Sequence, residues 1–145
     1  GNLELELEAT SLQQDTSSGE SQLTNPRLKL ETPPGTLWSI KSQIGTVSTR
    51  ASNQDGISEQ RIELSGNVLI SRRTAEDQLV EIRSDNFILL PKRQYGETLS
   101  SVTVNFGNNV TTAGKLSIDL RLGEMKLGSS STEYVETKIS ELKDW

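Results

Sequence analysis

The sequence predicts an all-β fold, either a sandwich or a barrel, from two observations. Apolar residues recur with a period of two along most of the chain, and turn-forming residues separate these alternating runs. A chain of 145 residues is long enough to bury one core. We therefore expect a single domain over residues 1–145, built from about eight antiparallel strands.

Four stretches carry the alternation most clearly, with mostly polar residues between the apolar ones. One face of each predicted strand therefore points inward and the other faces water. The alternating positions are Trp38, Ile40, Ser42 and Ile44; Ile62, Leu64, Gly66, Val68 and Ile70; Val102, Val104 and Phe106; and Leu116, Ile118, Leu120 and Leu122. The first strand is expected to span Leu3 to Leu12, and the last to end near Lys138.

Turn residues lie where these strands should end. Pro33-Pro34-Gly35 and Asp55-Gly56 predict turns, and Pro91 ends a strand because proline cannot donate a ladder hydrogen bond. Gly66 and Gly107 each precede an Asn, which indicates either a β-bulge or an ordinary turn. The apolar period continues through Gly66, so a bulge is favoured there.

The pattern after Leu127 is ambiguous. A capping box from Ser130 to Glu133 and apolar residues at helical spacing favour a helix, whereas the alternation around Tyr134 favours a last strand. We expect a strand through about Lys138.

Composition excludes several classes of function. The chain has no Cys and no His, which removes thiolate nucleophiles, disulfides, soft metal sites and the Ser-His-Asp triad. Its net charge of −5 argues against a protein that binds nucleic acid by neutralising phosphates. The longest apolar run is only Phe87 to Leu90, so the sequence contains no transmembrane helix or signal peptide.

Charged residues offer two further candidates. Paired carboxylates could serve as the acid and base of a glycosidase. However, Glu63, Glu81 and Asp119 lie on the polar phase of their strands and should face water. Neither Asp85 nor Glu124 supplies an inward-facing partner. The pairs Arg72-Arg73 and Lys92-Arg93 are either a clasp for phosphates or charged turns that keep the domain soluble. Successive turns lie at opposite ends of a sheet, so the two pairs should not form one site.

The first strand has leucines on one face, Leu3, Leu5 and Leu7, and glutamates on the other. The glutamates discourage edge-to-edge aggregation, and the leucines need cover. Two interpretations remain open: ordinary core packing, or the lining of an incompletely closed sheet whose interior is open to lipid tails.

The order of several short motifs resembles the LptC family, the membrane-anchored periplasmic component of lipopolysaccharide export. The resemblance covers roughly Leu3 to Leu127. The matching residues are Asn25-Pro26-Arg27-Leu28, Trp38-Ser39-Ile40-Lys41-Ser42, Ile62-Glu63-Leu64-Ser65-Gly66-Asn67-Val68, Ser84-Asp85-Asn86, Phe106-Gly107, Thr112-Ala113-Gly114 and Asp119-Leu120. The Pro26 segment followed by Trp38-Ser39-Ile40 points to LptC rather than to the related soluble protein LptA.

This resemblance implies a single twisted, partly open β-jelly roll in the periplasm, tethered to the inner membrane by an N-terminal helix that is not in this sequence. Such a domain takes lipopolysaccharide from the ABC transporter formed by LptB, LptF and LptG and hands it to LptA. It is not an enzyme and needs no cofactor or metal. Neighbouring jelly rolls dock edge to edge by β-augmentation, the N-terminal strand toward the transporter and the C-terminal strands toward LptA.

The strand phase and the resemblance together nominate site residues. The expected lipid-binding residues are Ile40, Ile62, Leu64, Ile82, Val102, Val104, Phe106 and Ile118, and the expected partner-docking residues are Leu5, Leu7, Gly107 and Tyr134. We expect Gly107→Arg to leave a folded domain that binds LptA weakly. A scaffold that joins partners without conducting lipid is the alternative function, and a homodimer through exposed edge strands is a further possible assembly.

Overall fold

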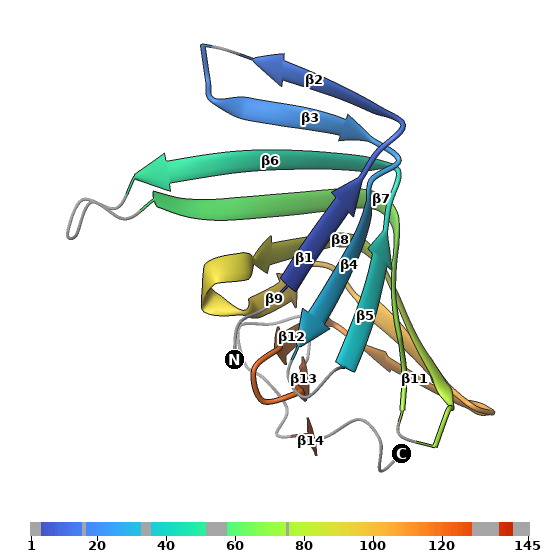
Figure 1. Ribbon diagram of the computed structural model, residues 1–145. Helices are drawn as coiled ribbons and strands as arrows, with labels where there is room; N and C mark the ends of the chain where they lie inside the picture. Colours follow the sequence, from blue (N-terminus) through green and yellow to red (C-terminus); the bar gives the residue numbers. More distant parts are fainter. Residues whose placement is uncertain are drawn as a thin grey trace.

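The structure, a computed structural model, describes residues 4–15, 17–32, 36–51, 58–74, 76–128 and 137–140. Within these ranges the chain forms fourteen antiparallel strands joined in one sheet, and the only helical segment is a 3-10 turn, η1 (Pro91–Arg93) (Figure 1). The strands are β1 (Glu4–Glu8), β2 (Ser11–Asp15), β3 (Glu20–Thr24), β4 (Arg27–Thr32), β5 (Thr36–Lys41), β6 (Ile44–Ala51), β7 (Ser58–Arg73), β8 (Leu79–Leu90), β9 (Tyr95–Thr98), β10 (Val102–Phe106), β11 (Asn109–Ala113), β12 (Lys115–Asp119), β13 (Glu124–Gly128) and β14 (Thr137–Ser140).

The long strands β7 and β8 divide this sheet into two halves. Half-sheet I has the order β2-β3-β6-β7-β8-β9-β12-β13-β14 and uses the first half of β7 and the second half of β8. Half-sheet II has the order β1-β4-β5-β7-β8-β10-β11 and uses the other halves of β7 and β8. In Figure 1, β2, β3 and β6 extend to the left of a shared corner, while β1, β4 and β5 extend below it.

The corner is a line of strand breaks that crosses the sheet. The backbone N–H of Thr10 donates to Thr24 O (3.0 Å), that of Asn25 to Gln43 O (2.8 Å) and that of Gln43 to Gly66 O (2.9 Å). Asn25 and Gly66 have positive φ (+50° and +79°), which Gly and Asn tolerate better than other residues. The breaks therefore satisfy their backbone groups with one another instead of leaving them unpaired.

The corner continues on the far side of β7 through polar side chains. The Asn86 amide accepts a hydrogen bond from Leu99 N (2.8 Å) and donates to Ser100 Oγ, and Ser84 Oγ donates to Ser101 O (3.1 Å). These bonds fix the connection from β9 to β10, where the chain passes from half-sheet I to half-sheet II. The corner thus involves β8 and its neighbours as well as the N-terminal strands.

The predicted bulge at Gly66 is confirmed. The register of β7 against β8 shifts between Ser65 and Val68, so Gly66 and Asn67 together oppose only Asp85. The predicted strand end at Pro91 is also confirmed, because β8 ends at Leu90. The turn at Gly107, in contrast, is an ordinary two-residue hairpin turn between β10 and β11 and not a bulge.

Several strand predictions were wrong because they missed the corner. The expected strand from Leu3 to Leu12 is two strands, β1 and β2, which pair with β4 and β3 respectively. Ile44 was expected to face inward, but the chain breaks before it and leaves it 55% exposed. Leu122, 58% exposed, lies in the β12–β13 turn. Where the sequence predicted one continuous strand across the corner, the structure has two, so the expected number of about eight strands was too low.

Part of the predicted tail is a strand, since β14 (Thr137–Ser140) pairs with β13. The rest of the tail, including Tyr134 and the capping box at Ser130, lies outside the described residues, as do Leu3 and the turns at 33–35 and 55–56.

Candidate functional site: the apolar interior

The eight residues expected to line the interior lie together in one buried cluster. Their exposed fractions run from 0% to 4%, and they come from β5, β7, β8, β10 and β12. The cluster also contains apolar residues that the sequence analysis did not nominate: Leu28, Leu30, Trp38, Val68, Ile70, Val80, Phe87, Leu89, Leu116, Leu120, Met125 and Leu127. Both half-sheets therefore contribute their inner faces to the same interior.

Strand register arranges these side chains in rows. In half-sheet II one row runs Leu7, Leu28, Ile40, Ile70, Ile82 and Val104 across neighbouring strands. In half-sheet I a row runs Val47, Ile62, Leu89, Gly96, Ile118 and Met125. Each row is aliphatic except at Gly96, so the lining is smooth and offers few hydrogen-bonding groups to a ligand.

Gly96 makes room for a fully buried aromatic ring in half-sheet I. A Cβ atom at this position would lie 2.2 Å from Cζ of Phe87, whose side chain is 1% exposed. No real Cβ approaches an aromatic carbon so closely, so the ring occupies the space where a side chain would be. The lining is thus closely packed here.

Sheet edges lie at both sides of this interior. In the described part of the chain, β1, β2, β11 and β14 each pair with a single neighbouring strand. Leu5 and Leu7 both belong to β1: Leu5 packs against the cluster, and Leu7 is 37% exposed. Gly107 lies in the β10–β11 turn with φ +58° and open space around it. The two leucines and the glycine therefore lie on or beside edge strands.

Three of the carboxylates considered for a catalytic pair have partners of another kind. Glu63 is exposed and pairs with Arg61 (2.7 Å), while Glu81 lies 3.7 Å from Arg83 on the outer face. Asp119 accepts hydrogen bonds from the backbone N–H groups of Arg121 and Leu122. No group of acidic side chains that could hold a metal ion occurs among the described residues.

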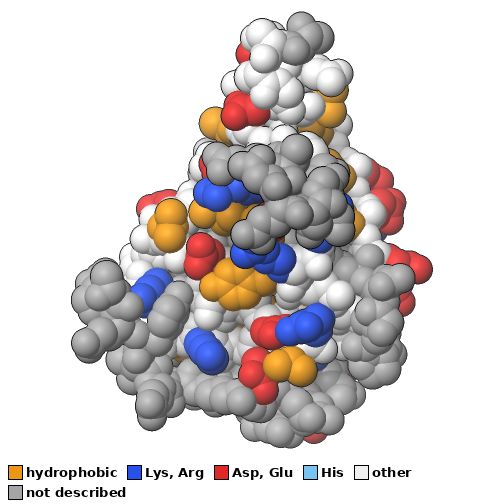
Figure 2. Space-filling view, turned by 90° about the vertical axis from the view of Figure 1, so that its left-hand side faces the viewer, with side chains coloured by type: hydrophobic (Ala, Val, Ile, Leu, Met, Phe, Trp, Pro, Cys, Tyr) orange, Lys and Arg blue, Asp and Glu red, His pale blue; other side chains and the backbone are white. Residues whose placement is uncertain are grey.

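The two basic pairs lie at opposite ends of β7. Arg93 forms an ion pair with Glu59 (2.6 Å) near the start of β7, whereas Arg72 and Arg73 end that strand. Arg73 faces outward and pairs with Asp77 (3.7 Å). The prediction that the pairs form no common site is confirmed. Figure 2 shows one face of the molecule, on which hydrophobic side chains appear only as separate patches among charged ones.

Comparison with known proteins now adds to this geometry. A family model described as "Lipopolysaccharide-assembly, LptC-related" matches residues 1–136. The chain belongs to the LptC family. The structure is similar to that of LptH from Pseudomonas aeruginosa, described as the LptA homologous periplasmic component of the lipopolysaccharide transport device. That similarity has a TM-score of 0.62 at 12% identity and covers 92% of this chain and 88% of LptH. No curated protein sequence matches the chain.

LptC-family membership and the LptA-like jelly-roll fold support a role in lipopolysaccharide transport. The LptC and LptA-like families are lipid transport proteins and are not known as enzymes. No helix in the described ranges is long and apolar enough to cross a membrane.

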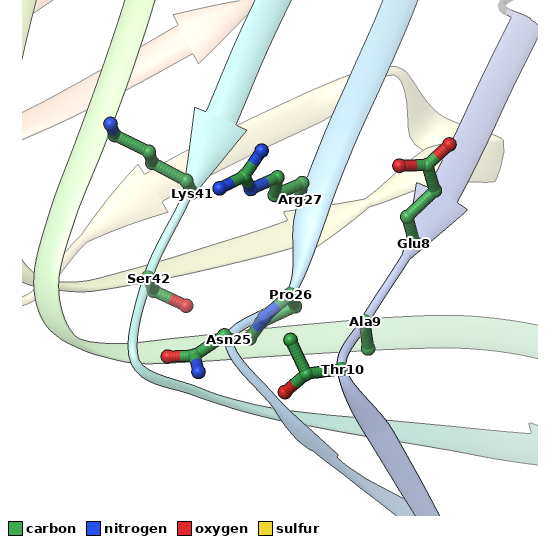
Figure 3. A pocket seen from close by; sticks show the side chains of 8 residues that line it. All are labelled: Glu8, Ala9, Thr10, Asn25, Pro26, Arg27, Lys41 and Ser42. Carbon is green, nitrogen blue, oxygen red and sulfur yellow. The ribbon is translucent and has the colours of Figure 1, made fainter.

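Four of the seven stretches that carry the LptC resemblance reach the corner, and the stretches also contribute residues to the buried cluster, among them Trp38, Ile62 and Phe106. Asn25-Pro26, Ser42 and Glu8 to Thr10 line a pocket on the outer side of the corner together with Arg27 and Lys41 (Figure 3). Gly66-Asn67 and Ser84-Asp85-Asn86 continue the same line. These stretches therefore contribute both to the bend of the sheet and to its apolar lining.

One charged residue that faces inward was not recognised as such in the sequence analysis. Arg72 continues the phase of Val68 and Ile70 along β7, and its guanidinium lies over the ring of Trp38, 5.0 Å from the ring centroid. Burial lowers the pKa of Arg72. The signal was present in the sequence as the next position of the alternation, but the Arg72-Arg73 pair was interpreted as either a phosphate clasp or a charged turn beyond the strand, and neither interpretation placed Arg72 on the inner face.

Proposed function

We propose that this LptC-family domain receives lipopolysaccharide from the inner-membrane ABC transporter LptB/LptF/LptG and passes it to LptA. The observation that carries the proposal is an aliphatic interior shared by two half-sheets and bordered by strands that have one partner each. Acyl chains need such a dry lining, and a sugar headgroup stays in water outside it. The whole chain acts as one periplasmic domain, held at the inner membrane in this proposal.

The packing of the interior sets a condition on this function. The eight nominated lining residues are at most 4% exposed, so acyl chains enter only when the half-sheets separate. In our proposal the corner acts as the hinge, because the strands break there and β7 bends at its bulge. Ile40, Ile62, Leu64, Ile82, Val102, Val104, Phe106 and Ile118 would then contact the acyl chains.

Photo-crosslinking tests this function. A small diazirine amino acid at Ile82 or Val104 should form adducts with lipopolysaccharide when the domain works with its transporter. Arg83 and Thr103, the next residues on the same strands, face the opposite side and are the matched controls. Adducts at the control positions alone, or at none of the four, would remove support for a lipid-conducting interior.

Close packing favours a second function, that of a scaffold. In this alternative the interior stays closed, and the domain joins its partners only through strand edges. The scaffold predicts normal binding of LptA without lipid adducts at Ile82 or Val104.

We also propose that partners dock by β-augmentation at the edges, with β1 and β2 toward the transporter and β11 and β14 toward LptA. Leu5, Leu7, Gly107 and Tyr134 would take part. Gly107→Arg should preserve the fold, because a side chain at this turn meets open space, but it should weaken binding of LptA. The backbone strain of a non-Gly residue at positive φ adds roughly 1 kcal/mol of destabilisation. A titration that gives unchanged affinity would disprove this docking role.

A further inference from the structure

An arginine faces inward within an otherwise apolar row of side chains. The row runs Leu5, Leu30, Trp38, Arg72, Val80 and Phe106 across half-sheet II. Leu30, Trp38 and Val80 are at most 1% exposed, so the guanidinium lies beside a dry surface. Removing a cation from water is costly unless another group compensates it, so the position of Arg72 requires an explanation.

The ring of Trp38 supplies only part of that compensation. The guanidinium lies 5.0 Å from the ring centroid, within the range of a cation–π interaction. No carboxylate forms an ion pair with Arg72 among the described residues, whereas its neighbour Arg73 has Asp77 and Arg83 has Glu81. Arginine stays protonated at neutral pH even when burial lowers its pKa, so the charge persists.

Two hydrogen-bond donors at this position have no acceptor among the described residues. Nε of Arg72 and Nε1 of Trp38 are both buried without a hydrogen-bond partner in this part of the chain, and the two residues are directly paired in the β5–β7 register. Buried donors in folded proteins almost always have a partner, so two adjacent ones without an acceptor indicate a missing group that accepts hydrogen bonds. That group must carry oxygen acceptors and, to balance the guanidinium, negative charge.

A glycine of half-sheet I lies opposite this position. Gly123, in the turn between β12 and β13 of half-sheet I, has φ +65°, and a Cβ atom there would lie 3.9 Å from an Nη atom of Arg72. Gly123 therefore presents backbone, and no side chain of its own, to the guanidinium. Arg72 lies between the half-sheets, at the border of the apolar interior, where the headgroup of an amphiphile would meet protein.

We propose that Arg72 and Trp38 bind a phosphate of the lipopolysaccharide headgroup while the acyl chains occupy the interior; this inference rests on the proposed function. A phosphate group offers several acceptor oxygens and at least one negative charge, which suits a guanidinium and an indole N–H. The site fixes how far the lipid enters, because the phosphate of the headgroup is held at Arg72 while the acyl chains extend along the aliphatic rows.

The test compares wild type with Arg72→Gln, Arg72→Lys and the matched control Arg73→Gln, which makes the same change of charge on the outer face. Each protein is titrated with lipopolysaccharide, with phosphatase-treated lipopolysaccharide and with inorganic phosphate. We expect Arg72→Gln to weaken binding of the phosphorylated lipid by about tenfold, as for a lost charge-assisted hydrogen bond. Arg72→Lys should lose part of this affinity, and Arg73→Gln none.

Binding of the dephosphorylated lipid should be equal in all four proteins. Inorganic phosphate should shift the Trp38 indole N–H resonance in wild type only at concentrations far above those of the lipid. The signal is assigned in a Trp145→Phe background, since the chain has two Trp residues. Thermal melts check that each variant folds, and Arg72→Lys keeps the test valid if Arg72→Gln does not.

The outcomes separate the two proposals. If wild type and the Arg72 variants bind phosphorylated lipid equally well, the phosphate site is disproved and the transport function stands. If wild type binds neither lipid form, the transport function itself fails. If free phosphate binds at Arg72 as tightly as the lipid does, the site belongs to a soluble anion, and the headgroup inference is overturned.

Discussion

At the scale of single residues, the packing of half-sheet I depends on a missing side chain. The Phe87 ring fills the space beside Gly96, where a Cβ atom would lie 2.2 Å from Cζ. Gly96→Ala should therefore destabilise the fold by about 1–3 kcal/mol, the usual cost of overpacking a core. Thermal or urea unfolding measures the loss.

The Gly96 prediction has two controls. Gly107→Ala places a methyl group in open space at φ +58°, so it should show only the backbone cost of about 1 kcal/mol. Phe87→Leu added to Gly96→Ala should recover part of the lost stability, because it removes the clashing ring atoms. Full stability in Gly96→Ala alone would contradict the packing described here.

The period-two alternation of apolar residues identified inward-facing residues correctly wherever a strand runs without interruption. Val102, Val104 and Phe106 are buried as expected, and so are Ile62 and Leu64. The same rule missed Arg72, because charge was given more weight than position. It misplaced Ile44, because the break at Gln43 depends on a hydrogen bond to Gly66, a residue distant in sequence. Such a partner is not visible from local periodicity.

At the scale of elements, the hairpin of β2 and β3 is an exposed part of half-sheet I. All five residues of β2 are exposed, so its turn must be ordered locally. The turn is fixed by Asp15, whose Oδ1 accepts hydrogen bonds from Ser17 Oγ (2.7 Å) and Ser17 N (2.9 Å). These bonds stabilise the carboxylate and lower the pKa of Asp15 below its usual range.

This hairpin should therefore loosen in acid. A carboxyl group with a lowered folded pKa contributes stability above its unfolded pKa, and the contribution is lost as pH falls through the folded value. A carbon-13 NMR titration should give Asp15 a midpoint below that of an ordinary aspartate. Ser17→Ala should raise the midpoint, and Ser11→Ala, at the other end of the hairpin, should not. A midpoint unmoved by Ser17→Ala would argue against this turn.

Element boundaries show most clearly what sequence reasoning could reach. The all-β class, the Gly66 bulge and the Pro91 strand end followed from local chemistry. The corner did not, because the first leucines read as one continuous strand across Ala9 and Thr10. Only pairing with two different partners, β4 and β3, separates β1 from β2. Strand breaks that depend on pairing with neighbouring strands involve residues distant in the sequence, so local sequence patterns do not reveal them.

At the scale of the whole molecule, the two half-sheets share one core. The buried cluster includes Trp38 and Ile40 from half-sheet II as well as Ile118 and Met125 from half-sheet I. In addition, β7 and β8 continue from one half to the other. Neither half-sheet can lose its structure without exposing the inner face of the other, so the domain should behave as a single cooperative unit.

We therefore expect one unfolding transition in urea. Trp38 fluorescence in a Trp145→Phe background reports on half-sheet II, and far-ultraviolet circular dichroism reports on all strands; the two curves should coincide. Native-state amide exchange should be slowest in β7 and β8, which pair along both half-sheets, and fastest in the exposed edge strand β2. Separate transitions would mean that the half-sheets are independent units, and the shared interior would then not be what holds the domain together.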